Sequence, residues 1–195
     1  MTRTCLKDRV LPDYSKGEEI FNMISHIVGA AFGFVALIVC VIISAFHRDI
    51  WAVASSCVYG LSLITLYTMS SLYHGLPSGL PKKVLQVLDH CTIYFLIAGT
   101  YTVVTLTRLR EVYPVTAWLV FGTVWLLACI ATVFTAIDLK KYRVFSMVCY
   151  IGMGWCIIFT AGAFIRAVGL ACAGYILLGG IFYTVGAVLY GIGKG

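Results

Sequence analysis

Histidine, aspartate and serine side chains beside strongly apolar stretches are the residues of this sequence best suited to chemistry. The segment 70–90, SSLYHGLPSGLPKKVLQVLDH, places Ser70 and His74 at the end of one apolar stretch and Asp89 and His90 just inside the next. An ionised aspartate costs about 2.5–3.5 kcal/mol at the centre of a membrane helix and less near its edge. Such groups usually face the interior of a helical bundle, so this segment is the first candidate for a functional site.

A third polar set lies where the first apolar stretch begins, in the segment EEIFNMISHIVG. Glu19, Asn22 and His26 stand at i, i+3 and i+7, so they share one helix face, and Ser25 lies beside them. If this helix starts near Glu18, His26 lies about 12 Å along it. The set therefore belongs to the same shallow depth as the residues of segment 70–90.

Helical spacing also aligns the residues of segment 70–90. Ser70 and His74 are at i and i+4, so they share a face. Asp89 lies roughly 9 Å into its stretch if that helix starts at Lys83. His90 follows directly and points about 100° away on a helix, so we expect Asp89 rather than His90 to face the site.

The elements that position these residues follow from the composition. The chain has 195 residues, of which 61% are hydrophobic and only 11% charged, and its mean hydropathy is +0.97. This is too few charged residues to cover the surface of a soluble domain. The sequence therefore predicts a polytopic membrane protein. The net charge of +6 does not indicate nucleic-acid binding, because the basic residues are scattered between apolar segments. The eight cysteines include no C-x-x-C pair, and most lie in apolar runs, so we interpret them as small apolar residues.

Six stretches exceed the roughly 20 residues that a membrane-spanning helix needs: 21–46, 51–72, 84–106, 112–137, 144–165 and 168–192. The links between them are short, so the sequence predicts an all-α helical bundle, a single transmembrane domain over residues 1–195 with a polar tail at 1–17. Ser15 and Glu18 have the spacing of a helix capping box. Gly29 and Gly33 form a G-x-x-x-G pattern that permits close helix packing.

Lysine and arginine predict the orientation of the bundle. Ten fall on the side of the amino terminus: Arg3, Lys7, Arg9, Lys16, Lys82, Lys83, Lys140, Lys141, Arg143 and Lys194. Four fall on the other side: Arg48, Arg108, Arg110 and Arg166. This asymmetry predicts a cytoplasmic amino terminus. The three polar sets, with three of the four histidines, then lie in one layer near the cytoplasmic surface.

Facing histidines with a carboxylate nearby suit a metal site. Imidazole nitrogens bind zinc in tetrahedral sites, and a catalytic site keeps one position for water that Asp89 could orient or deprotonate. The structural alternative is that His26 hydrogen-bonds a neighbouring helix, that Glu19 only favours the helix dipole, and that Asp89 pairs with Lys82 or Lys83. For each residue alone the structural interpretation is the commoner one, whereas for Asp89 and His74 together we favour a functional site.

Several separated motifs resemble the hemolysin III family of the progestin and adipoQ receptor superfamily. They are EEIFNMISHIVG, SSLYH, LDHCTIYFLIAGTYT, YIGMGW and GGIFYTVGAVLY, and the resemblance runs from about Gly17 to the last residue. It implies a seven-helix bundle with a cytoplasmic amino terminus and a zinc ion near the cytoplasmic side. It also implies that His74 is a zinc ligand, that Asp89 contacts the metal-bound water and that Ser70 lies near the same water.

The family pattern also has a part that this sequence lacks. In the family, two further zinc ligands form an H-x-x-x-H pair on the seventh helix, but this sequence stops at YGIGKG and contains no such pair. We therefore expect that the chain as given does not assemble the family's zinc site. Three explanations are open: the chain is truncated, it has lost the metal, or His26 and His90 replace the missing ligands. The directions of His26 and His90 disfavour the last.

Three functions follow from these considerations. The first is a zinc-dependent hydrolase of a lipid amide, as adiponectin-receptor members resemble ceramidases, with Asp89 as general base and Ser70 positioning water or the oxyanion. The second is a pore-forming or lytic protein, as the family name suggests, although no span shows a regular polar stripe. The third is a receptor or regulator that senses a lipid without turnover. All three place the chain in the cell membrane, with the lipid bilayer and a lipid-amide ligand or substrate as partners.

Overall fold

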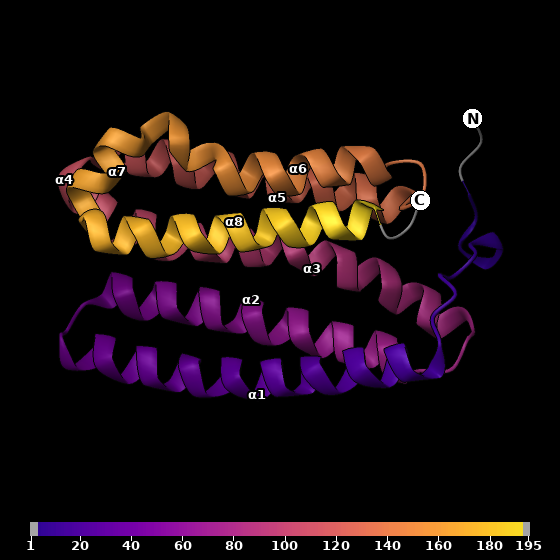
Figure 1. Ribbon diagram of the computed structural model, residues 1–195. Coiled ribbons are helices and arrows are strands. Elements are labelled where there is room, and N and C mark those ends of the chain that lie inside the picture. Colours follow the sequence, from indigo (N-terminus) through magenta and orange to yellow (C-terminus); the bar gives the residue numbers. More distant parts are fainter. Residues whose placement is uncertain (1–3, 193–195) are drawn as a thin grey trace.

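The computed structural model describes residues 4–192, and within that range the chain is helical with no strand (Figure 1). Six helices are long and apolar enough to cross a membrane, which confirms the predicted polytopic bundle. They are Lys16–Phe46 (α1), Ile50–Gly75 (α2), Leu80–Val112 (α3 and α4), Pro114–Ile137 (α5), Arg143–Val168 (α6 and α7) and Leu170–Ile192 (α8).

Two of these spans change helix type along their length. The third runs from α3 (Leu80–Val104) through a π-helical turn (Thr105–Leu109) into α4 (Arg110–Val112). The fifth runs from α6 (Arg143–Trp155) through a 3₁₀ turn (Cys156–Thr160) into α7 (Ala161–Val168).

The helices form two layers with α3 between them. In Figure 1, α1 and α2 lie in the lower layer, and α5, α6, α7 and α8 lie in the upper one. Consecutive helices pack against each other, α1 on α2, α2 on α3 and α3 on α5, while α8 contacts mainly α6 and α7. Because α8 does not pack closely against α2 or α3, space is left inside the bundle on that side.

Local sequence signals set the helix starts that position the site. The Ser15 hydroxyl accepts a hydrogen bond from the Glu18 backbone N–H at 3.3 Å, and the Glu18 carboxylate accepts one from the Ser15 backbone N–H at 2.7 Å. This confirms the capping box and fixes the first turn of α1, next to Glu19. The Asp49 carboxylate caps α2 in a similar way, and Pro81 stands in the first turn of α3.

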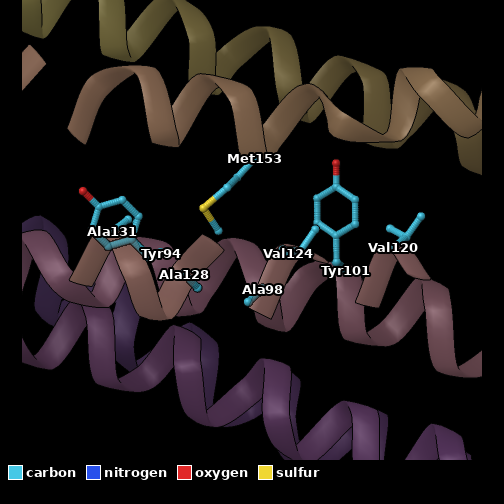
Figure 2. Close-up of a cluster of buried hydrophobic side chains, with 8 residues drawn as sticks. All are labelled: Tyr94, Ala98, Tyr101, Val120, Val124, Ala128, Ala131 and Met153. Carbon is cyan, nitrogen blue, oxygen red and sulfur yellow. The ribbon is translucent and has the colours of Figure 1, made fainter. Parts of the chain in front are cut away.

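The buried core joins α3, α5 and α6 (Figure 2). Its eight residues are Tyr94, Ala98, Tyr101, Val120, Val124, Ala128, Ala131 and Met153. The alanines let α3 and α5 approach closely, which is the usual source of packing energy between membrane helices. Both tyrosine hydroxyls find partners, because Tyr101 Oη donates to the Gly154 carbonyl at 2.9 Å and Tyr94 Oη lies 2.8 Å from Thr135 Oγ1.

Glycines make the contact between α1 and α2 close. A Cβ atom on Gly29 would lie 2.8 Å from the Tyr67 ring, and one on Gly33 would lie 3.3 Å from Leu63. This confirms the close packing predicted from the G-x-x-x-G pattern. Gly60 of α2 is tighter still, because its Cβ would lie 2.7 Å from the Cβ of Leu37.

Substituting Gly60→Ala therefore tests this contact. The new methyl group would meet Leu37 near its backbone, so α1 and α2 would have to separate, and we expect a loss of about 1–3 kcal/mol in the free energy of unfolding. The matched control is Gly122→Ala on α5, where nothing lies within 4 Å of the added Cβ. Thermal unfolding in mild detergent should show a lower midpoint for Gly60→Ala alone, and equal midpoints would contradict the packing.

Candidate functional site

The polar residues of α1, α2 and α3 meet at the end of the bundle where α1 begins, α2 ends and α3 begins (Figure 1). His74 Nδ1, at the end of α2, lies 2.6 Å from Glu19 Oε2 on α1. Lys82 Nζ, in the first turn of α3, lies 2.8 Å from Glu19 Oε1 and also donates to the Leu76 carbonyl at 2.9 Å. One carboxylate therefore joins three helices.

The Glu19 carboxylate stabilises this end of the bundle because its two partners are buried. The side chains of Lys82 and His74 are 6% and 8% exposed, and that of Glu19 is 20% exposed. A buried ammonium group is strongly destabilising unless a carboxylate and hydrogen bonds compensate it. The interpretation of Glu19 as a residue that only favours the helix dipole is therefore wrong, since it pairs directly with Lys82 and His74.

A group of aromatic rings surrounds His74. The ring centroid of His26 lies 6.0 Å from that of His74 and 5.6 Å from that of Tyr67. Tyr73 lies 4.7 Å from His74, and its ring faces Lys82 Nζ at 5.2 Å. His26 Nδ1 is buried and has no hydrogen-bond partner among the described residues, so the expected bond from this atom to a neighbouring helix is not formed.

Asp89 and His90 lie about two turns deeper on α3 than Lys82. Neither Lys82 nor Lys83 pairs with Asp89, because Lys82 contacts Glu19 and Lys83 Nζ donates to the Lys7 carbonyl at 2.5 Å. The predicted structural pairing of Asp89 is therefore wrong. The Asp89 carboxylate lies within electrostatic reach of the His26 imidazole.

His90 faces the same space as Asp89, contrary to the expectation from helix geometry. His90 Nδ1 donates to the Gln86 carbonyl at 2.8 Å and lies 3.8 Å from Asp89 Oδ2. Both residues line the same cavity, because its wall is wide enough to include side chains that diverge on α3.

That cavity has a volume of about 740 Å³ and lies between α2 and α3 on one side and α6, α7 and α8 on the other. Leu66, Ile93, Ile97, Ile151 and Phe164 form part of an apolar wall. Among the described residues of the wall, Asp89 is the only acidic residue and His90 is the only histidine. Both lie where the cavity approaches the polar end of the bundle. The space is large enough for part of a lipid chain, and its chemistry is apolar along most of its length.

The remaining predicted residues differ in their surroundings. Ser70 is 3% exposed and lies one turn before His74 on α2. Asn22 is half-buried, whereas Ser25 is exposed and its hydroxyl donates to the Asn22 carbonyl at 3.0 Å. Ser25 therefore does not join the buried cluster. Sequence reasoning missed Lys82 as a cluster member, although its place in the first turn of α3 put it near the end of α2.

The donor atoms present do not fit the three-ligand zinc site that the family resemblance implies. No group of three or more His, Cys, Asp or Glu residues within the described range is placed to hold a metal ion. His74 Nδ1 is engaged by Glu19, and His26 is the neighbouring histidine whose ring approaches it.

Removing the shared carboxylate should destabilise the bundle. We expect Glu19→Ala to lower the free energy of unfolding by about 3 kcal/mol, because it leaves the buried Lys82 ammonium without its counter-charge. Glu111→Ala is the matched control, since Glu111 pairs with Arg108 at an exposed site and should cost less than about 1 kcal/mol. Unfolding in mild detergent measures both, and a similar loss for the two variants would show that the Glu19 pair is not special.

Comparison with known proteins connects this arrangement to a family. Residues 14–194 match the family model described as "Haemolysin-III related". The chain is 36% identical to "Hemolysin-3" of Bacillus cereus over 173 residues, covering 89% of this chain and 78% of that protein. It is 34% identical to "Hemolysin-3 homolog" of Bacillus subtilis (strain 168), covering 89% of this chain and 80% of that protein.

A more distant similarity reaches animal proteins. The chain is 27% identical to "Monocyte to macrophage differentiation factor" of Homo sapiens over 157 residues, which cover 74% of this chain and 61% of that protein. No solved structure matches. With a family model that spans nearly the whole sequence and bacterial relatives above 30% identity, this multi-pass membrane protein belongs to the haemolysin III-related family.

Proposed function

We propose that this protein binds a lipid inside its helical bundle, with an apolar chain in the cavity and a polar group near Asp89 and His90. The observation that carries the proposal is a cavity of about 740 Å³ that is apolar along its length and has ionisable side chains at one end. A lipid amide suits this distribution, because its amide can hydrogen-bond to a carboxylate and an imidazole while its chain stays among apolar side chains.

The bundle itself supports entry from the membrane. The helices α6, α7 and α8 on one side of the cavity carry many exposed apolar side chains, so this side faces lipid. Gly179, Gly180 and Gly186 of α8 contribute to the cavity wall without side chains. A lipid chain can therefore occupy the cavity without displacing a packed helix.

Hydrolysis of a lipid amide is the finer function that the family resemblance implies. In that function His74 would be a zinc ligand, Asp89 would hold or move a proton, and Ser70 would lie near the reacting water. The donor atoms described here do not complete such a site. Binding without turnover, as in a lipid-sensing receptor or regulator, needs only the cavity and its polar end, and it is the function we propose.

Filling the cavity with a side chain should reduce the amount of lipid that the protein binds. We expect Gly180→Phe to reduce co-purified lipid several-fold, because an aromatic ring would take the place of the chain, while nothing within 4 Å opposes its Cβ. Gly122→Phe on the exposed face of α5 is the matched control, since that position also has open space and does not line the cavity. Mass spectrometry of lipids extracted from purified protein measures the effect, and equal lipid content in the two variants would contradict the proposal.

Metal content and turnover separate binding from hydrolysis. We expect less than one zinc ion per chain, no change in zinc content on His74→Ala, and no fatty acid released from ceramide, because the described residues do not supply three converging ligands. Elemental analysis and a fatty-acid assay measure these quantities. Stoichiometric zinc that is lost in His74→Ala would instead establish His74 as a ligand and favour the hydrolase.

Membrane lysis is a second candidate function, because two bacterial relatives carry the name Hemolysin-3. Dye release from liposomes tests it directly. Release that persists in Gly180→Phe would assign lysis to a surface other than the cavity.

A further inference from the structure

A second pocket lies at the same end of the bundle, and its wall includes residues of the amino-terminal segment that precedes α1 and of the start of α6. The Thr4 backbone N–H donates to Asp138 Oδ2 at 2.7 Å, and the Lys83 ammonium donates to the Lys7 carbonyl. Arg9 Nη2 donates to the Ile137 carbonyl at 3.3 Å. These contacts hold the segment against the start of α3 and against the link between α5 and α6.

The anchor of this segment is an ionised carboxylate. Burial by itself would raise the pKa of Asp138, but hydrogen bonds from the backbone N–H groups of Thr4, Lys141 and Lys140 outweigh it and hold the pKa at about 2. Asp138 is therefore charged at neutral pH. Its carboxylate oxygens accept hydrogen bonds from backbone N–H groups of the amino-terminal segment and of the link between α5 and α6.

Arg9 is the unusual residue of the segment. It is 7% exposed, and its Nε and Nη1 atoms are buried without a hydrogen-bond partner among the described residues. A guanidinium group stays charged in proteins and carries five N–H donors, yet Nη2 makes the one side-chain hydrogen bond found for it in this part of the chain. A buried charge with unused donors is costly unless an anion compensates it.

The pocket that Arg9 lines has a volume of about 250 Å³. Its described wall carries three cationic side chains, Arg9, Lys140 and Arg143, and one carboxylate, Asp8, so its net charge is 3 − 1 = +2 with His90 neutral. The planar donor array of a guanidinium matches carboxylate and phosphate oxygens, and a phosphate group can bring up to two negative charges to balance the +2 of this wall. We propose that this pocket binds a phosphate group.

The phosphate can belong to a phospholipid headgroup or to a free phosphate ion. His90, Met147 and Tyr150 line both this pocket and the large apolar cavity, so a headgroup here would have its chains beside the cavity. This favours an anionic phospholipid as the source, a preference that rests on the proposed lipid binding. The phosphate site itself rests on Arg9 and its neighbours alone.

The experiment uses the purified full chain and two probes. One arm titrates inorganic phosphate into protein in detergent by calorimetry, and the other measures phosphatidylglycerol against phosphatidylcholine by native mass spectrometry. We expect Arg9→Gln to weaken phosphate-dependent binding about tenfold, the effect of losing one charge-assisted hydrogen bond. Lys7→Gln, an exposed cation of the same segment that does not line the pocket, should stay within about twofold.

A second matched pair keeps the test independent of the folding of Arg9→Gln. Lys140 lines the pocket and its neighbour Lys141 does not, although both side chains are exposed. We expect Lys140→Gln to weaken binding more than Lys141→Gln does. Equal losses in both pairs would show that general surface charge attracts the anion and would overturn the proposal, as would no binding of either probe.

The two arms also separate the sources and the two proposals. Binding of phosphatidylglycerol that inorganic phosphate does not displace assigns the site to a lipid, and binding of inorganic phosphate alone assigns it to a free ion. Gly180→Phe fills the cavity but leaves Arg9 in place, so phosphate binding should survive in that variant. Loss of lipid in Gly180→Phe with retained inorganic phosphate binding would support both sites.

Discussion

The structure of the polar end depends on one half-buried carboxylate shared by three helices. Glu19 on α1 contacts His74 on α2 and Lys82 on α3, and both partners are nearly inaccessible. In a membrane the cost of an uncompensated charge prevents these helices from sliding or rotating independently. The register of α1, α2 and α3 at this end therefore follows from an ionic requirement, whereas the core of α3, α5 and α6 follows from small residues and packed tyrosines.

The helices on the two sides of α3 pack in different ways. Toward α1 and α2, the glycines at 29, 33 and 60 bring backbones together and leave no room for an added side chain at 29 or 60. Toward α8, glycines 179, 180 and 186 have nothing within 4 Å of an added Cβ, and they border a cavity. The same residue type thus closes one interface and opens the other. Close helix contacts therefore lie on the first side, and space for a ligand is left on the second.

Much of the fold could be predicted from the sequence, because length, apolarity and short links determine a six-span bundle, and capping and glycine patterns are local signals. The convergence of Glu19, His26, His74 and Asp89 at one end also followed from helical spacing. The specific pairings did not follow, because Glu19 and Asp89 are both possible partners for Lys82 by helical spacing, and only the distances show that Lys82 and His74 share Glu19. The prediction that Asp89 rather than His90 faces the site was wrong for a related reason. The cavity is wide enough that both residues line it, although they diverge by a large angle on one helix.

The roles of the histidines follow from their partners. His74 is held by a carboxylate at Nδ1, an arrangement that fixes the orientation of its ring. His26 lies against that ring with a buried Nδ1 that has no partner in the described chain, and the Asp89 carboxylate is within electrostatic reach. Under the proposed lipid binding, Asp89 and His90 at the end of the cavity would favour a lipid with a hydrogen-bonding group near the start of its chain, as an amide-linked lipid has.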